Sequence, residues 1–353
     1  MNEFQERNRR FLKAVEDNEL DGFLTSRRAN IRYLFNLDAS IAFGVTWGGE
    51  TTLLVDSRYF ETASQQAVNC RVKLARQIPD TSLLAFLSGG PVKQKGRLGF
   101  EEDHLTYGLV KTLESGLSRK RLIATSGLID HLRQVKSPEE LVEIRRAFKV
   151  AGASYHDVFG DFPWKGTELE LAGLLEYQLR KAGAEGPAFE TIVAGDVRSS
   201  LPHSRPTSEL IDDSSLLLVD FGAVVGGYHS DTTRVFLRPG TDEPDELRIV
   251  KEAQARAISA IRPGIPASAI DALARDYIAE HGHGEHFGHS LGHGLGLQIH
   301  ELPRIHKDSS VLLEPGMVFT VEPGIYLPGQ YGVRWEDAVI VTESGCEVLR
   351  IDS

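Results

Sequence analysis

Two pairs of acidic residues lie in apolar segments where their charges need compensation. The first pair is Asp220 and Asp231, in the segment 215–237, whose two β-branched runs flank Val225-Gly226-Gly227. That pattern predicts a β-hairpin. If Val225 and Gly226 form its two-residue tip, Asp220 lies directly opposite Asp231, with Cβ atoms about 4.5–5.5 Å apart. Because like charges are destabilising at that separation, we expect a cation between the two carboxylates.

The same arrangement recurs in the segment 318–342. Gly329 is the centre of a turn rich in Pro and Gly, and Glu322 and Glu336 are symmetric about it. A regular register therefore places a second carboxylate pair across a second hairpin. Two such pairs in apolar strands are difficult to explain as solvated surfaces. Four carboxylates together are able to hold and bridge two metal ions.

A histidine is the fifth candidate ligand. Seven of the chain's 12 histidines lie between His281 and His306, and His281, His283 and His286 fall at a polar helix-to-loop junction where we expect them to be solvated. His293 differs, because the glycines around it let the backbone approach another group closely. One imidazole with several carboxylates suits a hard or borderline divalent ion such as Mn²⁺, Co²⁺ or Zn²⁺.

The sequence blocks around these residues resemble those of one known family. The run 289–301, His-Ser-Leu-Gly-His-Gly-Leu-Gly-Leu-Gln-Ile-His-Glu, is similar to the signature of the pita-bread metallopeptidases, which include aminopeptidase P, prolidase and methionine aminopeptidase. Four further blocks agree in the family's order: Pro202-His203, Asp220-Phe221-Gly222-Ala223 with Ser230-Asp231-Thr232-Thr233-Arg234, Glu322-Pro323-Gly324, and Val333-Arg334-Trp335-Glu336-Asp337.

The N-terminal half narrows the resemblance to one branch. The blocks 30–34 and 55–59 are similar to the N-terminal domain of aminopeptidase P and prolidase, which methionine aminopeptidases usually lack. The creatinase branch and the non-catalytic relatives do not keep the five ligand types that are present here. Trp335 is a small departure, since Ile or Val is more usual between the Arg and the Glu of the last block.

The resemblance implies a role for each candidate ligand. Asp220 binds one ion in bidentate fashion, His293 and Glu322 bind the other, and Asp231 and Glu336 bridge both. Two ions that share a water lower its pKa toward neutrality, so a bridging hydroxide becomes the nucleophile. Glu322 is also implied as the group that accepts the water proton and passes it to the leaving nitrogen. Mn²⁺ or Co²⁺ is the expected ion, with Zn²⁺ as an alternative.

Further residues are implied as contacts of the substrate. His203 and His300 match imidazoles that contact the scissile carbonyl and the tetrahedral intermediate. Arg334 lies two residues from Glu336, so we expect it on the same strand face, orienting a bridging carboxylate. Arg304 matches an arginine that receives the substrate carboxylate in small prolidases. The remaining substrate-binding candidates are His289, Tyr228 and Tyr326, and the two tyrosines either line the site or only fill it.

The expected activity is metal-dependent hydrolysis of Xaa-Pro bonds by an exopeptidase of the prolidase or aminopeptidase P type. Proline's nitrogen has no hydrogen, so such an enzyme recognises the pyrrolidine ring through an apolar slot. The choice between dipeptides and longer proline-containing peptides stays open. Two alternatives also remain at this point, a peptidase like methionine aminopeptidase and a catalytically silent fold that binds a peptide or a partner.

Length and pattern predict two domains. At 353 residues the chain exceeds the size of most single cores. Residues 1–130 alternate helical patterns with strand-like runs at 21–26, 51–57 and 97–102, which predicts an α/β domain of the creatinase/prolidase N-terminal type. Residues 131–353 are expected to form an α+β pita-bread catalytic domain. A capping box at Ser137-Pro138-Glu139-Glu140 predicts that a long helix begins there.

Charge and cysteine usage exclude several classes of protein. A formal charge of -11 repels nucleic acid and anionic membrane, and we find neither a signal peptide nor a membrane-spanning segment, so a cytoplasmic location is expected. Only two cysteines are present, which makes a disulfide framework or a thiolate zinc site improbable. From the resemblance we expect a homodimer, with the N-terminal domain serving association and substrate access.

Overall fold

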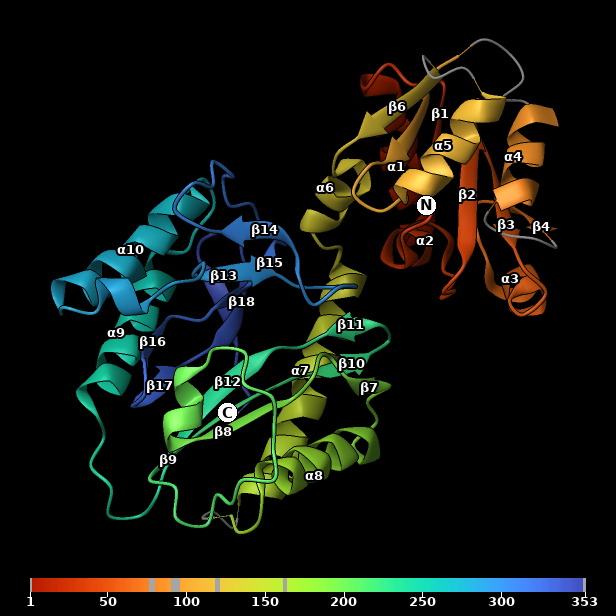
Figure 1. Cartoon of the computed structure of the whole chain (residues 1–353). Helices are drawn as coiled ribbons and strands as arrows, with labels where there is room; N and C mark the ends of the chain where they lie inside the picture. Colours follow the sequence, from red (N-terminus) through yellow and green to blue (C-terminus); the bar gives the residue numbers. More distant parts are fainter. Residues whose placement is uncertain (1, 76–79, 90–95, 118–120, 161–163, 352–353) are drawn as a thin grey trace. The chain divides into compact units, whose positions relative to one another are not determined.

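The computed structural model describes residues 2–75, 80–89, 96–117, 121–160 and 164–351. The chain divides into two compact units, residues 1–133 and 134–353 (Figure 1). Within the described residues, no helix is long and apolar enough to cross a membrane. The two cysteines, Cys70 and Cys346, are both free, as expected.

The first unit is built on a mixed six-stranded sheet with the strand order β4-β3-β2-β1-β5-β6. Its strands are β1 (Gly22–Thr25), β2 (Ala42–Trp47), β3 (Glu50–Val55), β4 (Arg71–Leu74), β5 (Leu98–Glu101) and β6 (Leu122–Thr125). Its helices are α1 (Glu3–Asp17), α2 (Arg28–Phe35), α3 (Phe60–Gln66), α4 (Asp80–Gly89), α5 (Tyr107–Gly116) and α6 (Leu128–Gln134).

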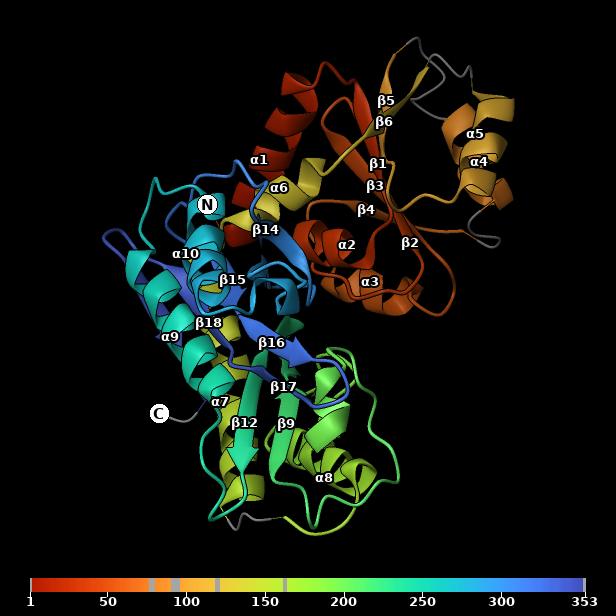
Figure 2. The ribbon, with the colours of Figure 1, turned by 60° about the vertical axis from the view of Figure 1, so that its left-hand side comes forward.

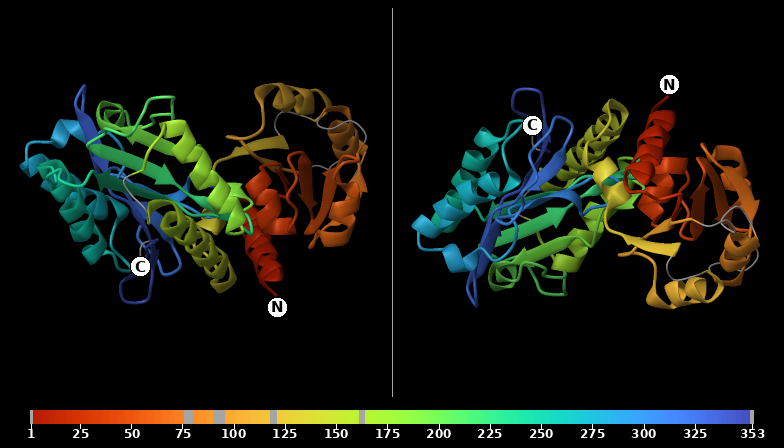
Figure 3. Two further views of the ribbon diagram at one scale, coloured as in Figure 1. Left: turned by 90° about the horizontal axis from the view of Figure 1, so that it is seen from below. Right: turned by 90° about the horizontal axis from the view of Figure 1, so that it is seen from above.

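Helices cover both faces of this sheet because successive residues of its strands point to opposite sides. Leu24 of β1 belongs to a core with Leu87 of α4 and Leu113 of α5. The preceding residue, Phe23, packs edge-on against Phe11 of α1, with ring centroids 5.8 Å apart. Figure 3 shows helices on either side of the strands of this unit. The expected α/β architecture of the N-terminal residues is therefore present.

The described part of the second unit contains four long helices: α7 (Pro138–Phe159), α8 (Glu168–Lys181), α9 (Asp245–Ala260) and α10 (Ala267–Glu280). The capping box predicted at the start of α7 is confirmed. The Glu140 amide donates to the Ser137 hydroxyl at 3.2 Å, and the Ser137 amide donates to the Glu140 carboxylate at 3.0 Å. Two short 3-10 turns, η3 (Asp196–Ser200) and η4 (Gly284–His286), lie in the connections.

The strands of the second unit form four small sheets. Their orders are β11-β10-β7, β12-β9-β8, β14-β13-β15-β18-β19 and β16-β17. The strands are β7 (Gly186–Pro187), β8 (Ile192–Gly195), β9 (Leu216–Phe221), β10 (Ala223–Val225), β11 (Tyr228–His229), β12 (Thr232–Leu237), β13 (Gly292–Gly294), β14 (Glu301–Ile305), β15 (Val318–Val321), β16 (Gly324–Leu327), β17 (Tyr331–Arg334), β18 (Asp337–Val341) and β19 (Cys346–Leu349).

Helices lie outside these strands on two sides. Val250 of α9 and Ile270 of α10 share one core with Leu218 of β9, Phe319 of β15 and Val339 of β18. In Figure 2, α9 and α10 lie on one side of the strands of this unit, while α8 lies on the other. The strands between the helices are thereby shielded from water, so polar groups that point inward from them lie in a medium of low polarity.

The register of the first hairpin differs from the prediction. Val225 pairs with Tyr228, so the two-residue tip is Gly226-Gly227, and Asp220 pairs with Thr233 instead of Asp231. The reason is local, because Gly226 and Gly227 both have positive φ, at 56° and 76°, as a type I′ turn requires. The shift is two residues, which preserves the face. Asp231 therefore lies diagonal to Asp220 on the same side of the ribbon.

The predicted register of the second hairpin is confirmed. Gly324 pairs with Arg334 and Leu327 with Tyr331 across the Gly329 turn, and Val321 pairs with Asp337 in the continuing strands. All three pairs are symmetric about Gly329. Glu322 and Glu336 are thus at equivalent positions of the two arms, at the junction between the two strand pairs.

Gly222 allows β9 and β10 to pass close to the returning strand. An added Cβ would lie 1.9 Å from the Ser230 carbonyl oxygen, which belongs to the backbone and has little freedom to move. We expect Gly222→Ala to lower the free energy of unfolding by about 1–3 kcal/mol, the usual effect of overpacking. Gly173→Ala in α8, where an added Cβ meets open space, is the control and should stabilise slightly. Urea denaturation measures both, and equal effects would contradict the clash.

Candidate metal centre

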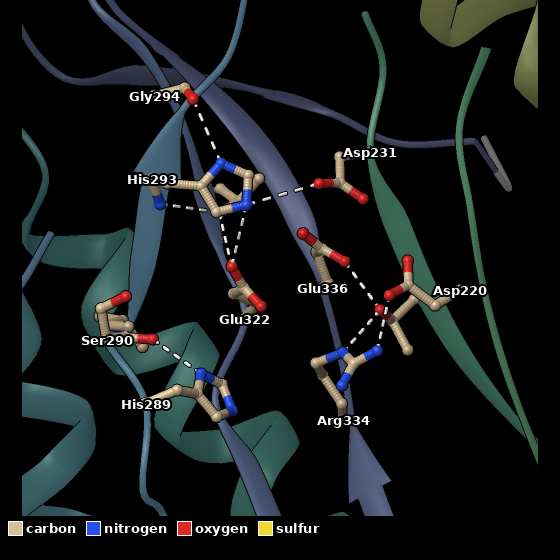
Figure 4. A network of polar contacts seen from close by, with 12 residues as sticks. Asp220, Asp231, His289, Ser290, His293, Gly294, Glu322, Arg334 and Glu336 are labelled. Atoms are coloured by element: carbon tan, nitrogen blue, oxygen red, sulfur yellow. Dashed lines mark hydrogen bonds and ion pairs between the residues drawn. The ribbon is translucent and has the colours of Figure 1, made fainter. Parts of the chain in front are cut away.

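Five side chains from separate strands converge on one point in the second unit (Figure 4). They are Asp220 in β9, Asp231 before β12, His293 in β13, Glu322 after β15 and Glu336 before β18. Asp220, Asp231 and Glu336 are only 8%, 5% and 1% exposed. The structure therefore brings together all five residues that the sequence proposed as ligands.

The spacing of the ligand atoms fits a shared cation. Asp231, His293 and Glu336 each offer one atom within 4.8 Å of the others. His293 Nε2 lies 3.3 Å from Glu322 Oε1 and 3.5 Å from Asp231 Oδ2. Ligand atoms about 2.1 Å from a tetrahedral ion are roughly 3.4 Å from one another.

His293 presents a lone pair to this cluster. Its Nδ1 lies 3.1 Å from the Gly294 carbonyl oxygen, which can only accept, so Nδ1 carries the hydrogen. Nε2 is then unprotonated and faces Asp231 and Glu322. Burial lowers the pKa of His293, which keeps the imidazole neutral and available as a ligand.

Burial and the neighbouring negative charges destabilise the ionised forms of the carboxylates in the cluster. Burial raises the pKa of Asp231 well above its usual range, and the charges of Glu336 and Asp220 raise it further. Burial likewise raises the pKa of Glu336, with Glu322 and Asp220 adding to the effect. Burial also raises the pKa of Glu322. A divalent cation would favour the ionised forms of all of them.

Two oxygens in the cluster have no hydrogen-bond partner among the described residues. They are Asp220 Oδ1 and Glu336 Oε1, and both are buried. The second oxygen of each is occupied, since Asp220 Oδ2 accepts from Arg334 at 2.6 Å and Glu336 Oε2 accepts from Thr233 at 2.7 Å. A buried carboxylate oxygen without a partner is costly, so this donor set fits a metal.

Arg334 points into the site, as expected, but it binds a different carboxylate from the one expected. Its Nη2 donates to Asp220, implied as a terminal ligand, whereas a bridging carboxylate was predicted. Its Nε donates to the Thr233 hydroxyl at 2.9 Å, and through that hydroxyl it reaches Glu336. Asp220 and Thr233 are a directly opposed pair of β9 and β12, so one guanidinium reaches both.

Two threonines that sequence reasoning missed orient the ligands. The Thr233 hydroxyl donates to Glu336, and the Thr320 hydroxyl donates to Glu322 at 3.1 Å. Thr320 also accepts the His293 amide at 3.1 Å. Both threonines lie two residues from a ligand, Thr233 from Asp231 and Thr320 from Glu322. Strand alternation was the signal that places them on the ligand face.

The two candidate tyrosines have different surroundings. The Tyr326 hydroxyl accepts from Arg334 at 2.7 Å and lies 3.2 Å from His289 Nε2, so both residues belong to the wall of the site. Burial lowers the pKa of His289. The Tyr228 hydroxyl instead donates to Glu140 of α7 at 3.1 Å.

His300 and His203 approach the cluster from its exposed side. The His300 ring packs edge-on against the His293 ring, with centroids 4.3 Å apart. Partial burial, with the nearby His293 and His203, lowers the pKa of His300 to about 4. His203 is exposed, and the carbonyl of the preceding residue, Pro202, accepts a hydrogen bond from Arg334 at 3.3 Å. Arg304, also exposed, is paired with His293 across β13 and β14.

Trp335 does not contribute a wall to the centre. Its ring lies between the side chains of Arg234 and Lys251, with the Arg234 guanidinium carbon and the Lys251 Nζ each 4.7 Å from the ring centroid. Lys251 belongs to α9, so Trp335 points to the helix side, whereas Arg334 and Glu336 point to the ligands. The departure at position 335 therefore changes the packing behind the site.

Comparisons with known proteins agree with this geometry. Residues 142–343 match metallopeptidase family M24, and residues 7–135 match the Creatinase/Prolidase N-terminal domain. The Xaa-Pro dipeptidase of Pyrococcus furiosus is 34% identical over 98% of this chain and 97% of its own. The solved Xaa-Pro dipeptidase from Bacillus anthracis has a TM-score of 0.89 at 36% identity, with 98% and 97% covered. The X-Pro aminopeptidase from Thermotoga maritima scores 0.88 at 32% identity, with 97% of each chain covered.

The fold and the site define a metallopeptidase with an added N-terminal α/β domain. The chain belongs to metallopeptidase family M24. The N-terminal match confirms the expected resemblance to the prolidase and aminopeptidase P branch. The similarity to the solved dipeptidase confirms the pita-bread fold of the second unit. Divalent metal ions are the cofactors that this family implies.

Metal should contribute strongly to stability, because it relieves the repulsion among four neighbouring carboxylates, three of which are buried. We expect a chelator to lower Tm, and Mn²⁺ at about 100 times its Kd to restore roughly 2.7 kcal/mol of unfolding free energy. Glu336→Gln, which removes one charge and one ligand, should gain much less from added Mn²⁺. Differential scanning calorimetry measures the shift. A wild-type Tm independent of metal would contradict the assignment of the site.

Proposed function

We propose that this protein is an exopeptidase that hydrolyses Xaa-Pro bonds with two divalent ions held by Asp220, Asp231, His293, Glu322 and Glu336. The observation that carries the proposal is the pair of buried oxygens without a partner, Asp220 Oδ1 and Glu336 Oε1, beside the lone pair of His293. The names of the similar dipeptidases and of the aminopeptidase supply the substrate class. The sharpest test is product analysis on Ala-Pro beside Ala-Pro-Ala.

Each part of the proposed reaction has a residue on the site. Bound divalent ions supply Lewis acidity and a water of lowered pKa. Glu322, whose pKa is raised by burial and whose Oε1 is held by Thr320, accepts a proton and returns it to the leaving nitrogen. Arg334 holds Asp220 in place and keeps the Tyr326 hydroxyl turned toward His289.

Two imidazoles are proposed to contact the scissile carbonyl. The pKa of about 4 makes His300 neutral at physiological pH, so it offers one N–H donor without a charge. His203 follows Pro202, whose carbonyl accepts a hydrogen bond from Arg334 of the site, so we place His203 in the same region. A hydrogen bond from either ring would stabilise the developing oxyanion more than the ground-state carbonyl.

Arg304 is proposed to set the length of the substrate. Directly paired residues project on the same face of a sheet, so Arg304 shares the face of His293. No hydrogen bond or ion pair of its guanidinium is found within the described ranges. It is therefore available to receive the terminal carboxylate of a dipeptide, which lies next to the scissile bond.

We propose Mn²⁺ or Co²⁺ as the native ion, because four hard carboxylates and one imidazole suit these ions and no thiolate is present. Metal analysis of protein purified without added metal tests this choice. The methionine-aminopeptidase alternative is disfavoured by the N-terminal match, and the silent-fold alternative by the complete ligand set.

Four further expectations stay predictions. Residues 1–130 are proposed to act in association and substrate access, residues 131–353 to form the catalytic domain, and the protein to be a homodimer, since the N-terminal match is to a domain of relatives expected to associate through it. Sedimentation velocity of the full chain measures the oligomeric state. The cytoplasmic location is testable by cell fractionation.

Asp231→Asn is expected to abolish activity and lower metal content while the protein stays folded. The substitution removes charge without changing volume, and it relieves repulsion in the metal-free centre, so stability should change less than turnover. Ala-Pro turnover and elemental analysis are measured together. The control is Asp213→Asn, which alters an exposed carboxylate and should behave like wild type. Full metal content with wild-type turnover in Asp231→Asn would show that the ligand assignment is wrong.

Arg304→Ala is expected to raise KM for Ala-Pro by an amount equivalent to about 1.5–3 kcal/mol, the value of a hydrogen bond to a charged group. The same change should barely affect Ala-Pro-Ala, whose carboxylate lies one residue further away. Arg262→Ala, at another exposed arginine, is the matched control. Equal losses on the two peptides, or no loss on either, would favour an aminopeptidase P type activity.

A further inference from the structure

Glu168, the first residue of α8, is a buried carboxylate whose hydrogen bonds all lead to one distant segment. Its side chain is 1% exposed. Oε1 accepts the Gly195 amide at 3.1 Å, and Oε2 accepts the Thr207 amide at 2.9 Å and the Thr207 hydroxyl at 2.8 Å. Arg198 Nε lies 2.9 Å from both oxygens. Every donor belongs to the segment 195–207, which contains His203.

Arg198 also forms hydrogen bonds to the turn that carries His203. Its Nη2 donates to the Ser204 hydroxyl at 3.1 Å and to the Arg205 carbonyl at 2.6 Å. The Ser204 amide donates in turn to the Leu201 carbonyl at 3.1 Å. Glu168 and Arg198 therefore hold the two ends of the tight turn on which His203 is presented.

The turn depends on these side chains because its own backbone has little regular structure. Residues 201–209 contain no helix or strand in the described structure, although the Thr207 and Glu209 carbonyls accept the Leu169 and Glu168 amides at 3.0 and 3.1 Å at the far end of the segment. A segment of this kind is held by whatever hydrogen bonds its polar groups find. Loss of the Glu168 acceptors would leave several donors unsatisfied at once, so we expect the segment to move.

The same segment is joined to the metal centre. Arg334, which holds Asp220, donates to the Pro202 carbonyl at 3.3 Å. The Gly332 amide of β17 donates to the Ser199 hydroxyl of η3 at 2.9 Å. The segment is therefore attached on one side to the strand that carries Arg334 and on the other to Glu168.

A purely local role for Glu168 does not explain these contacts. A carboxylate in the first turn of a helix stabilises the helix through its dipole, and Thr167 already caps α8 by accepting the Glu170 amide at 3.2 Å. The Glu168 oxygens instead accept from residues 195, 198 and 207.

We propose that Glu168 and Arg198 are positioning residues that hold His203 where it contacts the scissile carbonyl. This inference rests on the proposed function, because His203 is assigned its role there. Glu168 acts through the turn and touches neither substrate nor metal. Its loss should therefore affect the chemical step more than metal binding.

The first experiment compares Glu168→Gln with Glu170→Gln, two matched changes on the same helix, using Ala-Pro and added Mn²⁺. Glu168→Gln replaces an acceptor oxygen by an amide that faces donors. We expect kcat to fall about 10- to 100-fold, as for a small misplacement of a catalytic group, with KM and metal content nearly unchanged. Glu170→Gln should be neutral, since glutamine also completes a capping box. Metal loss in Glu168→Gln that accounts for its lower kcat would overturn the proposal.

The second experiment tests whether the effect passes through His203. His203→Ala and the double variant Glu168→Gln/His203→Ala form a double-mutant cycle. If Glu168 acts by placing His203, the double variant should be no slower than His203→Ala alone. Multiplying losses would show that Glu168 acts independently of His203 and would overturn the proposal.

Arg198→Lys provides a second route, because Arg198 is 27% exposed and its replacement is tolerated more easily than that of Glu168. Lysine keeps a positive charge beside Glu168. It lacks the planar guanidinium, so it cannot bind Glu168 and also donate to Ser204 and Arg205. We expect a smaller kcat loss that also disappears in the His203→Ala background. An unchanged kcat in Arg198→Lys would contradict the proposal that Glu168 and Arg198 position His203.

Amide hydrogen exchange separates this inference from the proposed function, since it needs no peptide hydrolysis. The Gly195 and Thr207 amides should exchange faster in Glu168→Gln, while those of β15 and β18 should be unchanged. Unaltered exchange in the segment 195–207 would show that Glu168 does not hold this segment, and would overturn the proposal. If the wild-type protein fails to hydrolyse Ala-Pro but exchange is faster in Glu168→Gln, the proposed function is wrong. The conclusion that Glu168 holds the segment 195–207 would then still stand.

Discussion

Three buried carboxylates and a half-buried fourth, Glu322, lie beside one another and repel each other, and the surrounding structure is arranged around that repulsion. Water is largely excluded from Asp220, Asp231 and Glu336, so burial and their mutual charge raise the pKa of Asp231 and Glu336 together. Arg334 is the single cation hydrogen-bonded directly to one of the four among the described residues, and it leaves one oxygen of Asp220 unbonded. The compensation is incomplete without divalent metal, which makes metal binding and stability of this unit parts of one balance.

The hairpins provide the rigidity that this balance requires. Each candidate ligand lies in a strand or next to one, where ladder hydrogen bonds fix the backbone, and neighbouring side chains orient Asp220, Glu322 and Glu336. Thr233 joins Arg334 to Glu336, and Thr320 joins the His293 amide to Glu322. Such partners hold a ligand in one rotamer, so that little reorganisation is needed when an ion binds.

The two histidines proposed to contact the scissile carbonyl, His203 and His300, lie on less regular backbone, and ion pairs hold that backbone. Glu168 and Arg198 enclose the turn of His203. A second ion pair joins Lys136 to Glu301, the residue directly after His300. The Lys136 Nζ and Glu301 Oε1 atoms are 3.0 Å apart, and the two side chains are 1% and 3% exposed. An ion pair this deeply buried adds little net stability, but removing one partner leaves a charge uncompensated. Its contribution is then to specify a single backbone position beside the site.

Sequence alone determined the features that depend on local rules. The capping box at residues 137–140, the symmetry of the second hairpin about Gly329 and the isolation of His293 among glycines follow from neighbouring residues, so the candidate ligands could be proposed from the sequence. The tip of the first hairpin is also set locally, because two positive-φ glycines select one of the two adjacent residue pairs that satisfied the pattern. Tertiary structure decided that strand ends far apart in the chain meet at the metal centre. It also decided that Arg334 binds Asp220, that Tyr228 binds Glu140 and that Glu168 holds the segment of His203. These contacts join residues far apart in the chain, and no local propensity specifies which polar groups a folded core brings within hydrogen-bond distance.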